Sequence, residues 1–178
     1  MTSLLQGGDG STLWSPASSA GGTNTGTLGF SSWYLSVSFN APAATYTTIS
    51  ANLSPGDSSG INPTYGSVAA ESGGVFSFAD SGLWKVTFSA VRYNPPGVTV
   101  ANYMLYFIDY SSDAGVSWEG SGAPYQGDSG GGQGTVGGCT LVRAFDITAN
   151  SRVRFGYYPQ SGAPTITGYN RFQFERLT

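Results

Sequence analysis

Apolar side chains recur at every second position through most of this chain. Residues 33–39 are typical, because tryptophan, leucine, valine and phenylalanine alternate there with tyrosine and serine. This period of two places successive side chains on opposite faces of a β-strand. Similar runs occupy residues 46–49, 75–78, 83–91, 116–119, 139–147, 152–158 and 169–177. No window combines the helical i, i+3, i+4, i+7 spacing with capping residues, so we expect an all-β protein.

Clusters of glycine, proline, serine and asparagine separate these runs and mark the turns. Residues 75–78 and 83–91 flank the short turn 79–82, which predicts a hairpin. Residues 98–110 are the most apolar run and are hydrophobic on both faces, which predicts a central strand. About eight to ten short strands joined by such turns predict an antiparallel two-sheet sandwich.

The first 27 residues are rich in glycine, serine and threonine and lack the alternating pattern. A polar segment of this kind cannot build a core of its own. Its candidate anchors are Leu4, Leu5, Leu13 and Trp14. We therefore divide the chain into an extended N-terminal arm, residues 1–27, and a sandwich domain, residues 28–178. We expect the arm to lie on a neighbouring subunit or on another protein, the alternative being an arm folded back on its own domain.

The chain contains no histidine, and charged residues make up only 10% of it. Histidine is the side chain that titrates near neutral pH, so acid–base catalysis and serine activation are both disfavoured. Residues 127–131, Gly-Asp-Ser-Gly-Gly, resemble the segment around the nucleophile of trypsin-like proteases, but no histidine is present to take the serine proton. The string runs on into further glycines and predicts a loop. None of the ten acidic residues forms a paired-carboxylate motif, so we expect neither an enzyme nor a cofactor.

Ten acidic and seven basic residues give a net charge of −3, with no basic cluster. Phosphate binding needs clustered lysine and arginine, so we expect no nucleic-acid partner. No run approaches the ~20 apolar residues of a membrane span, and residues 1–5 lack the start of a signal peptide, so we expect no membrane partner and assembly inside a cell. Cys139 is the single cysteine, so no intrachain disulfide can form. We expect its side chain to serve as a small buried apolar group.

Asp109 and Asp113, with Asp128 further along the chain, are the acidic residues that come nearest to a calcium-binding set. Calcium takes about six to eight oxygen ligands, usually from a loop of characteristic spacing. These three aspartates have no such spacing. We therefore expect solvated turn residues here and no metal site.

The segment from Tyr65 to Phe88 resembles the central signature of the C1q/TNF-like jelly-roll superfamily. That signature has a tyrosine, a short spacer, a Gly-x-Phe strand and then Gly-x-Tyr/Trp-x-Phe. The matching residues here are Tyr65, Gly74, Phe76, Gly82, Trp84, Val86 and Phe88. Residues 145–155 and 167–174 are similar to later strands of the family, although Asn150 and Ser151 stand where the family has Gly-Asp. The resemblance extends over residues 33–177.

The resemblance implies a two-sheet antiparallel jelly-roll sandwich that forms a compact homotrimer through aromatic and aliphatic strand faces. Candidates for the trimer interface or the core are Tyr103, Leu105, Phe107, Tyr157 and Phe172. For each of these side chains, ordinary burial inside one subunit is the alternative.

A jelly roll serves many functions, so the function must be inferred from features outside the fold. The chain has no collagen repeat and no disulfide, so secreted animal members of the superfamily fit poorly. Bacteriophage virions use small trimeric jelly rolls as capsid decoration or cement proteins. We expect such a structural protein, assembled in the host cytoplasm and bound through its arm to the major capsid protein on the virion surface. The alternative is a receptor- or carbohydrate-binding head of a phage tail fibre, in which Trp118 and Tyr125 stack on sugars, unless Trp118 simply covers the sheet end.

Overall fold

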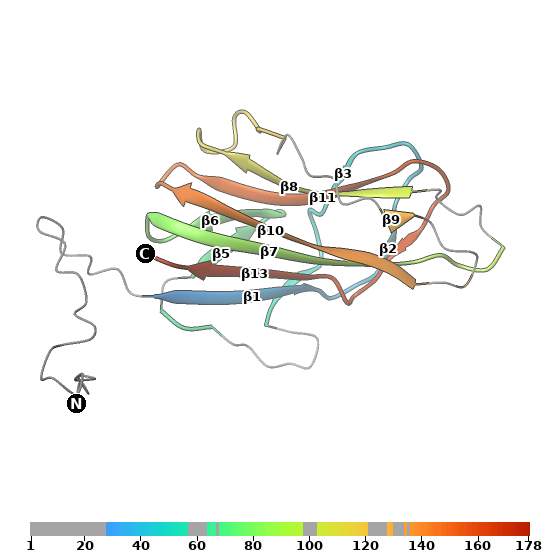
Figure 1. The fold of residues 1–178 in the computed structure, drawn as a ribbon, viewed down its shortest axis with the longest axis horizontal. Helices are drawn as coiled ribbons and strands as arrows, with labels where there is room; N and C mark the ends of the chain where they lie inside the picture. Colours follow the sequence, from blue (N-terminus) through green and yellow to red (C-terminus); the bar gives the residue numbers. More distant parts are fainter. Residues whose placement is uncertain are drawn as a thin grey trace, which may run out of the picture.

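The computed structural model describes residues 28–56, 64–66, 68–97, 103–120, 128–129, 134 and 136–178. Throughout these residues there is no helix, and the strand pairings are antiparallel. Two sheets pack face to face (Figure 1), which confirms the prediction of an all-β jelly-roll sandwich. The predicted arm with Leu4, Leu5, Leu13 and Trp14 lies outside the described residues, as does Tyr125.

The first sheet, called the β7 sheet below, is built around one long strand pair. It contains β1 (Gly29–Leu35), β2 (Phe39–Asn40), β4 (Leu53–Pro55), β7 (Gly82–Tyr93), β10 (Val136–Ile147), β12 (Thr165–Ile166) and β13 (Arg171–Arg176). Strands β7 and β10 have 12 residues each and pair along their whole length. Strands β13 and β1 follow on the other side of β7. Among the described residues, β10 pairs only with β7 and is therefore an edge strand.

The second sheet, called the β11 sheet below, is centred on β11. It contains β3 (Thr47–Thr48), β5 (Ala69–Ser72), β6 (Val75–Phe78), β8 (Tyr103–Ser111), β9 (Asp128–Ser129) and β11 (Arg152–Pro159). Strand β11 pairs with β8 on one side and with β3 and β6 on the other. The glycine-rich segment, expected to be a loop, supplies β9, whose two residues pair with the start of β8.

Residues 98–102 of the predicted central strand lie outside the described residues, and strand β8 lies between β11 and β9. Among the described residues, its pairing on the side away from β11 consists of the two-residue β9 and a single bridge from Tyr110 to Glu119. The prediction that this strand is buried on both faces is wrong. Its inward residues, which include Ile108, are buried, whereas Leu105 and Phe107 on the outward face are only half-buried. On the outward face, Phe107 packs against the ring of Tyr46.

The predicted hairpin of residues 75–78 and 83–91 is also wrong, because β6 and β7 belong to different sheets. The hairpin partner of β6 is β5, joined to it through Gly73 and Gly74. Phe78 and Trp84 face each other across the sandwich with ring centroids 4.9 Å apart. The chain crosses between the sheets because each strand can then bury its alternate aromatic residues against the other sheet.

Strand β1 starts and stops earlier than the predicted run of residues 33–39. It ends at Leu35, whose N–H donates to the Asn170 carbonyl, and Val37 is 53% exposed. After Leu35 the chain leaves strand β1, and the N–H of Ser36 donates to the carbonyl of Asn52, which lies outside the named strands. Strand β2 resumes at Phe39.

Two glycines of the family signature occupy places where no other residue fits. Gly74 has φ of 83°, and a Cβ there would lie 2.1 Å from the carbonyl oxygen of Ile49. Gly82 has φ of 134°, and its Cβ would lie 2.1 Å from the carbonyl oxygen of Thr178. Positive φ and close backbone contact both require glycine, so these positions set the turns on either side of β6.

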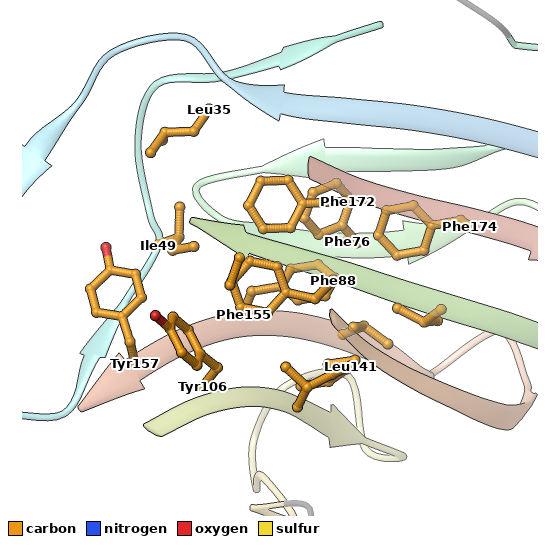
Figure 2. Close-up of a cluster of buried hydrophobic side chains, with 14 of the residues drawn as sticks. Leu35, Ile49, Phe76, Phe88, Tyr106, Leu141, Phe155, Tyr157, Phe172 and Phe174 are labelled. Carbon is orange, nitrogen blue, oxygen red and sulfur yellow. The ribbon is translucent and has the colours of Figure 1, made fainter. Parts of the chain in front are cut away.

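The core is a cluster of phenylalanines between the two sheets (Figure 2). Phe155 of β11 lies 4.7 Å from Phe172 of β13 and 5.2 Å from Phe88 of β7, measured between ring centroids. Phe76 of β6 lies 4.6 Å from Phe174 of β13. All five side chains are fully buried, so the cluster joins four strands drawn from both sheets.

We expect Phe155→Ala to lower the free energy of unfolding by about 3–5 kcal/mol, because it leaves a cavity at the centre of the cluster. The matched control is Val116→Ala, whose side chain is 86% exposed and whose loss should change stability by less than about 0.5 kcal/mol. Urea unfolding followed by tryptophan fluorescence measures both. Equal effects of the two substitutions would contradict the assignment of Phe155 to the core.

Candidate functional site

Exposed apolar side chains gather on the outward face of the β7 sheet, called the outward β7 face below. Among the described residues, ten large hydrophobic side chains are exposed. Seven of them lie on or beside this face: Leu28, Tyr65, Leu83, Val136, Val142, Tyr169 and Leu177. The other three, Val37, Tyr46 and Val116, are scattered elsewhere. A concentration of this kind on one face is typical of a binding surface.

The centre of the outward β7 face carries mostly uncharged side chains. Val142, Thr87, Gln173 and Ser32 form one cross-strand row, and Thr140, Ser89 and Arg171 belong to the next row. The charged residues that point outward from this sheet are Lys85, Asp146, Arg171 and Glu175. Lys85 and Glu175 are cross-strand neighbours and form an ion pair with each other. A partner that covers the centre of this face would therefore bury few charges.

At one end of this face, three leucines form a further row. The N–H of Leu177 donates to the carbonyl of Leu83 at 2.8 Å, and Leu28 comes directly before the pair formed by Gly29 and Arg176. The C terminus and the start of β1 lie at this same end of the molecule (Figure 1). The described part of the chain therefore begins beside an exposed apolar row.

At the other end of the outward β7 face lies a groove of about 580 Å³, called the tyrosine groove below. Its aromatic lining comes from Tyr34 of β1, Tyr93 of β7 and Tyr169, which precedes β13. Its hydroxyl lining comes from Ser36, Ser38, Thr165 and Thr167. Among the described residues, none that lines the groove carries a carboxylate, ammonium or guanidinium group. The sequence carries no local signal for this site, because its three tyrosines are far apart in the chain.

Asn170 supports the floor of the groove. Its side chain is fully buried, donates to the carbonyls of Val91 and Thr167 at 2.6 and 2.8 Å, and accepts from the N–H of Val91 at 3.1 Å. Its backbone carbonyl accepts from Leu35 at 3.1 Å. These bonds connect β1, β7 and the segment before β13, so the groove lining is held in place before any ligand binds.

The outward face of the β11 sheet is organised differently, around a cluster of Arg154, Asp109, Trp118 and Tyr46, called the arginine cluster below. The Nε of Arg154 lies 3.0 Å from Oδ2 of Asp109, and the Tyr46 hydroxyl donates to the same oxygen. The guanidinium carbon lies 4.1 Å from the centroid of the Trp118 ring and 6.0 Å from that of Tyr46. Trp118 thus stacks on Arg154, which leaves one face of the indole covered.

Gly156 makes room for Tyr46 in this arrangement. A Cβ at Gly156 would lie 2.8 Å from the Thr47 carbonyl and 3.0 Å from the Tyr46 hydroxyl. The Tyr46 ring also packs on Phe107 at a centroid distance of 5.0 Å. Burial, together with the neighbouring Asp109 carboxylate, raises the pKa of Tyr46 well above its ordinary value, so the phenol stays protonated and donates.

The aspartates weighed as calcium ligands have separate partners. Asp109 belongs to the arginine cluster, whereas Asp113 closes a turn in which the Ser117 hydroxyl and N–H donate to it at 2.5 and 2.9 Å. The side chain of Asp128 lies outside the described part of the chain. Within the described residues, no group of three or more acidic, cysteine or histidine side chains could hold a metal ion.

The residues predicted for the trimer interface or core occupy two different places. Tyr157 and Phe172 are fully buried between the sheets of a single chain. Leu105 and Phe107 are half-buried on the outward face of the β11 sheet, and the structure does not describe the side chain of Tyr103. The contact between copies predicted for these five residues stays a prediction. Cys139 lies half-buried on the inward side of β10, packed against the core.

No described helix has the length and apolar character needed to cross a membrane. No family model matches this chain, and no curated protein sequence matches it. Solved structures do resemble it in fold. One is the crystal structure of murine APRIL at pH 8.0, with a TM-score of 0.59 and 8% identity over 85% of this chain and 100% of that chain. Another is Eiger TNF from S. frugiperda, with a TM-score of 0.54 and 9% identity over 85% of this chain and 94% of that chain.

These two likenesses establish the TNF-like jelly-roll fold for the described domain. They agree with the resemblance found in residues 65–88, in which Gly74 and Gly82 occupy turns and Phe76, Trp84 and Phe88 lie in the core. At this level of identity the likeness concerns the fold alone. The function must therefore be inferred from the surfaces of this chain.

The hydrogen bonds from Ser117, and then from Ser111, hold the pKa of Asp113 at about 2, below its ordinary value of 3.8. Because they favour the ionised carboxylate, their stabilising effect is present above the unfolded value of 3.8 and is lost as the pH falls through about 2. We expect Ser117→Ala to raise the pKa of Asp113 toward 3.8. Titration of the carboxyl carbon by NMR measures the shift, and an unchanged midpoint would contradict the role of Ser117.

Proposed function

We propose that this chain is a non-catalytic structural protein, a homotrimeric decoration protein that binds the outer shell of a bacteriophage capsid and stabilises it. The observation that carries the proposal is the outward β7 face, where seven of the ten exposed large hydrophobic side chains of the described residues lie, with few charged side chains at the centre. The same face supplies a surface for association between copies and leaves the arm free to contact a different protein.

Two properties of the β7 sheet favour association between copies. Its edge strand β10 has 12 residues, of which the first seven carry no charge. A long edge with unpaired backbone groups is a liability in a monomer and is usually covered by another chain or by its own side chains. Val142 and Val136 project from this strand beside the mostly uncharged centre of the face. A copy that packs on β10 would cover both the backbone edge and these side chains.

The arginine cluster favours the capsid decoration function over the tail-fibre alternative. In a tail-fibre head, Trp118 would stack on a host sugar, but one face of its indole is already covered by Arg154. The described polar clusters also act as structural contacts: Asp109 is bonded to Tyr46 and Arg154, and Asp113 is bonded to Ser117. These arrangements favour a structural role over catalysis and over sugar binding at Trp118.

The arm provides the proposed attachment to the shell. In this proposal, the arm's Leu4, Leu5, Leu13 and Trp14 bury themselves against the major capsid protein. Each large apolar side chain that becomes fully buried contributes about 1.5–3 kcal/mol. Three arms on one trimer act together through effective concentration, so weak single contacts produce firm attachment. Assembly would take place in the host cytoplasm, with the finished protein on the virion surface.

We expect Val142→Glu to weaken the homotrimer, because each copy would bury a carboxylate in the contact. The dissociation constant should rise at least about tenfold, the equivalent of 1.4 kcal/mol. Size-exclusion chromatography with light scattering over a dilution series measures the change. The control is Val116→Glu, a similar substitution at a side chain 86% exposed and away from the outward β7 face. A wild-type protein that is monomeric at all concentrations would overturn the proposed assembly.

We expect removal of residues 1–27 to abolish attachment to capsids while leaving the trimer intact, because the arm and the outward β7 face contact different molecules. Co-sedimentation of purified protein with undecorated capsids measures attachment. The milder variant Leu13→Ser with Trp14→Ser tests the anchors without shortening the chain. Full attachment of the truncated protein would contradict the tether. If removal of residues 1–27 left capsid binding unchanged but abolished adsorption to cells, the result would favour the tail-fibre function.

A further inference from the structure

The tyrosine groove has the composition of a small-ligand site. Its volume of about 580 Å³ lies within the range of ~300–1,000 Å³ usual for such sites. It combines apolar lining with a few polar groups, a combination that binds and orients a ligand at the same time. Tyr169 is 67% exposed at its rim, while Tyr34 and Tyr93 are half-buried.

The polar groups of the groove are hydroxyls. All of them can accept a hydrogen bond from a ligand, although those of Ser36, Thr165 and Thr167 already donate within the protein. Ser38 Oγ accepts from the N–H of Gly168 at 3.0 Å, which leaves its own proton free to donate. Thr167 Oγ1 accepts from the N–H of Tyr169 at 3.3 Å and donates to Val91, so it orients the tyrosine. A phenolic hydroxyl donates and accepts, and its ring presents an apolar surface.

The described lining residues are uncharged, which favours an uncharged ligand. A phosphate, a carboxylated sugar or a peptide terminus would lose its hydration there without an opposite charge to replace it. A purely apolar ligand would leave the Ser38 proton without a partner. A neutral saccharide satisfies both conditions, because its C–H faces pack on tyrosine rings while its hydroxyls bond to serine, threonine and tyrosine.

We propose that the tyrosine groove binds a neutral saccharide, with Tyr34, Tyr93 and Tyr169 as its aromatic contacts. The site is separate from Trp118, the sugar-stacking residue of the tail-fibre alternative, and lies on the other sheet. Asn170 holds the lining in position, so the ligand meets a preformed surface and little ordering opposes binding. The groove lies at the β2 and β12 end of the outward β7 face, away from the leucine row. The inference goes beyond the proposed decoration function.

The test uses the full-length protein and saturation-transfer NMR with maltotriose, lactose and chitobiose as neutral probes. Sialyllactose serves as the charged probe. We expect saturable binding of at least one neutral probe and none of sialyllactose. Tyr169→Ala should weaken that binding by about tenfold, because the substitution removes a rim ring without opening the core. The matched control is Tyr65→Ala, a tyrosine 60% exposed on the same sheet but outside the groove, which should leave binding unchanged.

Three results would overturn the inference. The first is no binding of any neutral probe at concentrations on the order of 10 mM. The second is equal weakening by Tyr169→Ala and Tyr65→Ala, which would place the ligand elsewhere. The third is binding by the Val142→Glu variant alone, which would mean that association between copies closes the groove in the native protein. Binding by both wild type and Val142→Glu supports the site whatever the outcome for the trimer.

Discussion

The burial of five phenylalanines between two sheets is the interaction on which the rest of this structure depends. Phe155 and Phe76 of the β11 sheet meet Phe88, Phe172 and Phe174 of the β7 sheet at centroid distances between 4.6 and 6.3 Å. A strand can contribute an aromatic residue to this layer only at every second position. The remaining positions therefore point outward, and the two outward faces are free to differ.

The two outward faces differ in how far their side chains cover one another. On the β11 sheet, Arg154, Trp118, Tyr46 and Phe107 pack on one another over the site left open by Gly156. That surface is covered by its own side chains. On the β7 sheet, the central outward residues are mostly uncharged, apolar residues lie around them, and β10 pairs on one side only among the described residues. This contrast is the reason why we propose association and ligand binding on the β7 sheet, because a surface covered by its own side chains has little apolar area left for a partner.

Much of the fold could be predicted from the sequence, and the failures share a cause. The runs around residues 83–91, 139–147 and 152–158 became β7, β10 and β11, since alternation depends only on neighbours in the chain. The hairpin of β6 with β7 failed because alternation does not say which sheet a strand joins. The tyrosine groove could not be predicted, because Tyr34, Tyr93 and Tyr169 meet only when β1, β7 and the segment before β13 lie side by side.

The sequence by itself determined that the chain forms strands, which side chains of each strand share a face, and where glycine must stand. These properties are local, since the period of two and the φ angles of Gly74 and Gly82 concern single residues and their neighbours. Only the tertiary structure decided which strands share a sheet, that β8 lies near an edge, and which outward residues form a common surface. Those outcomes depend on contacts between residues far apart in the chain, where the burial of aromatic rings between the sheets outweighs local preference.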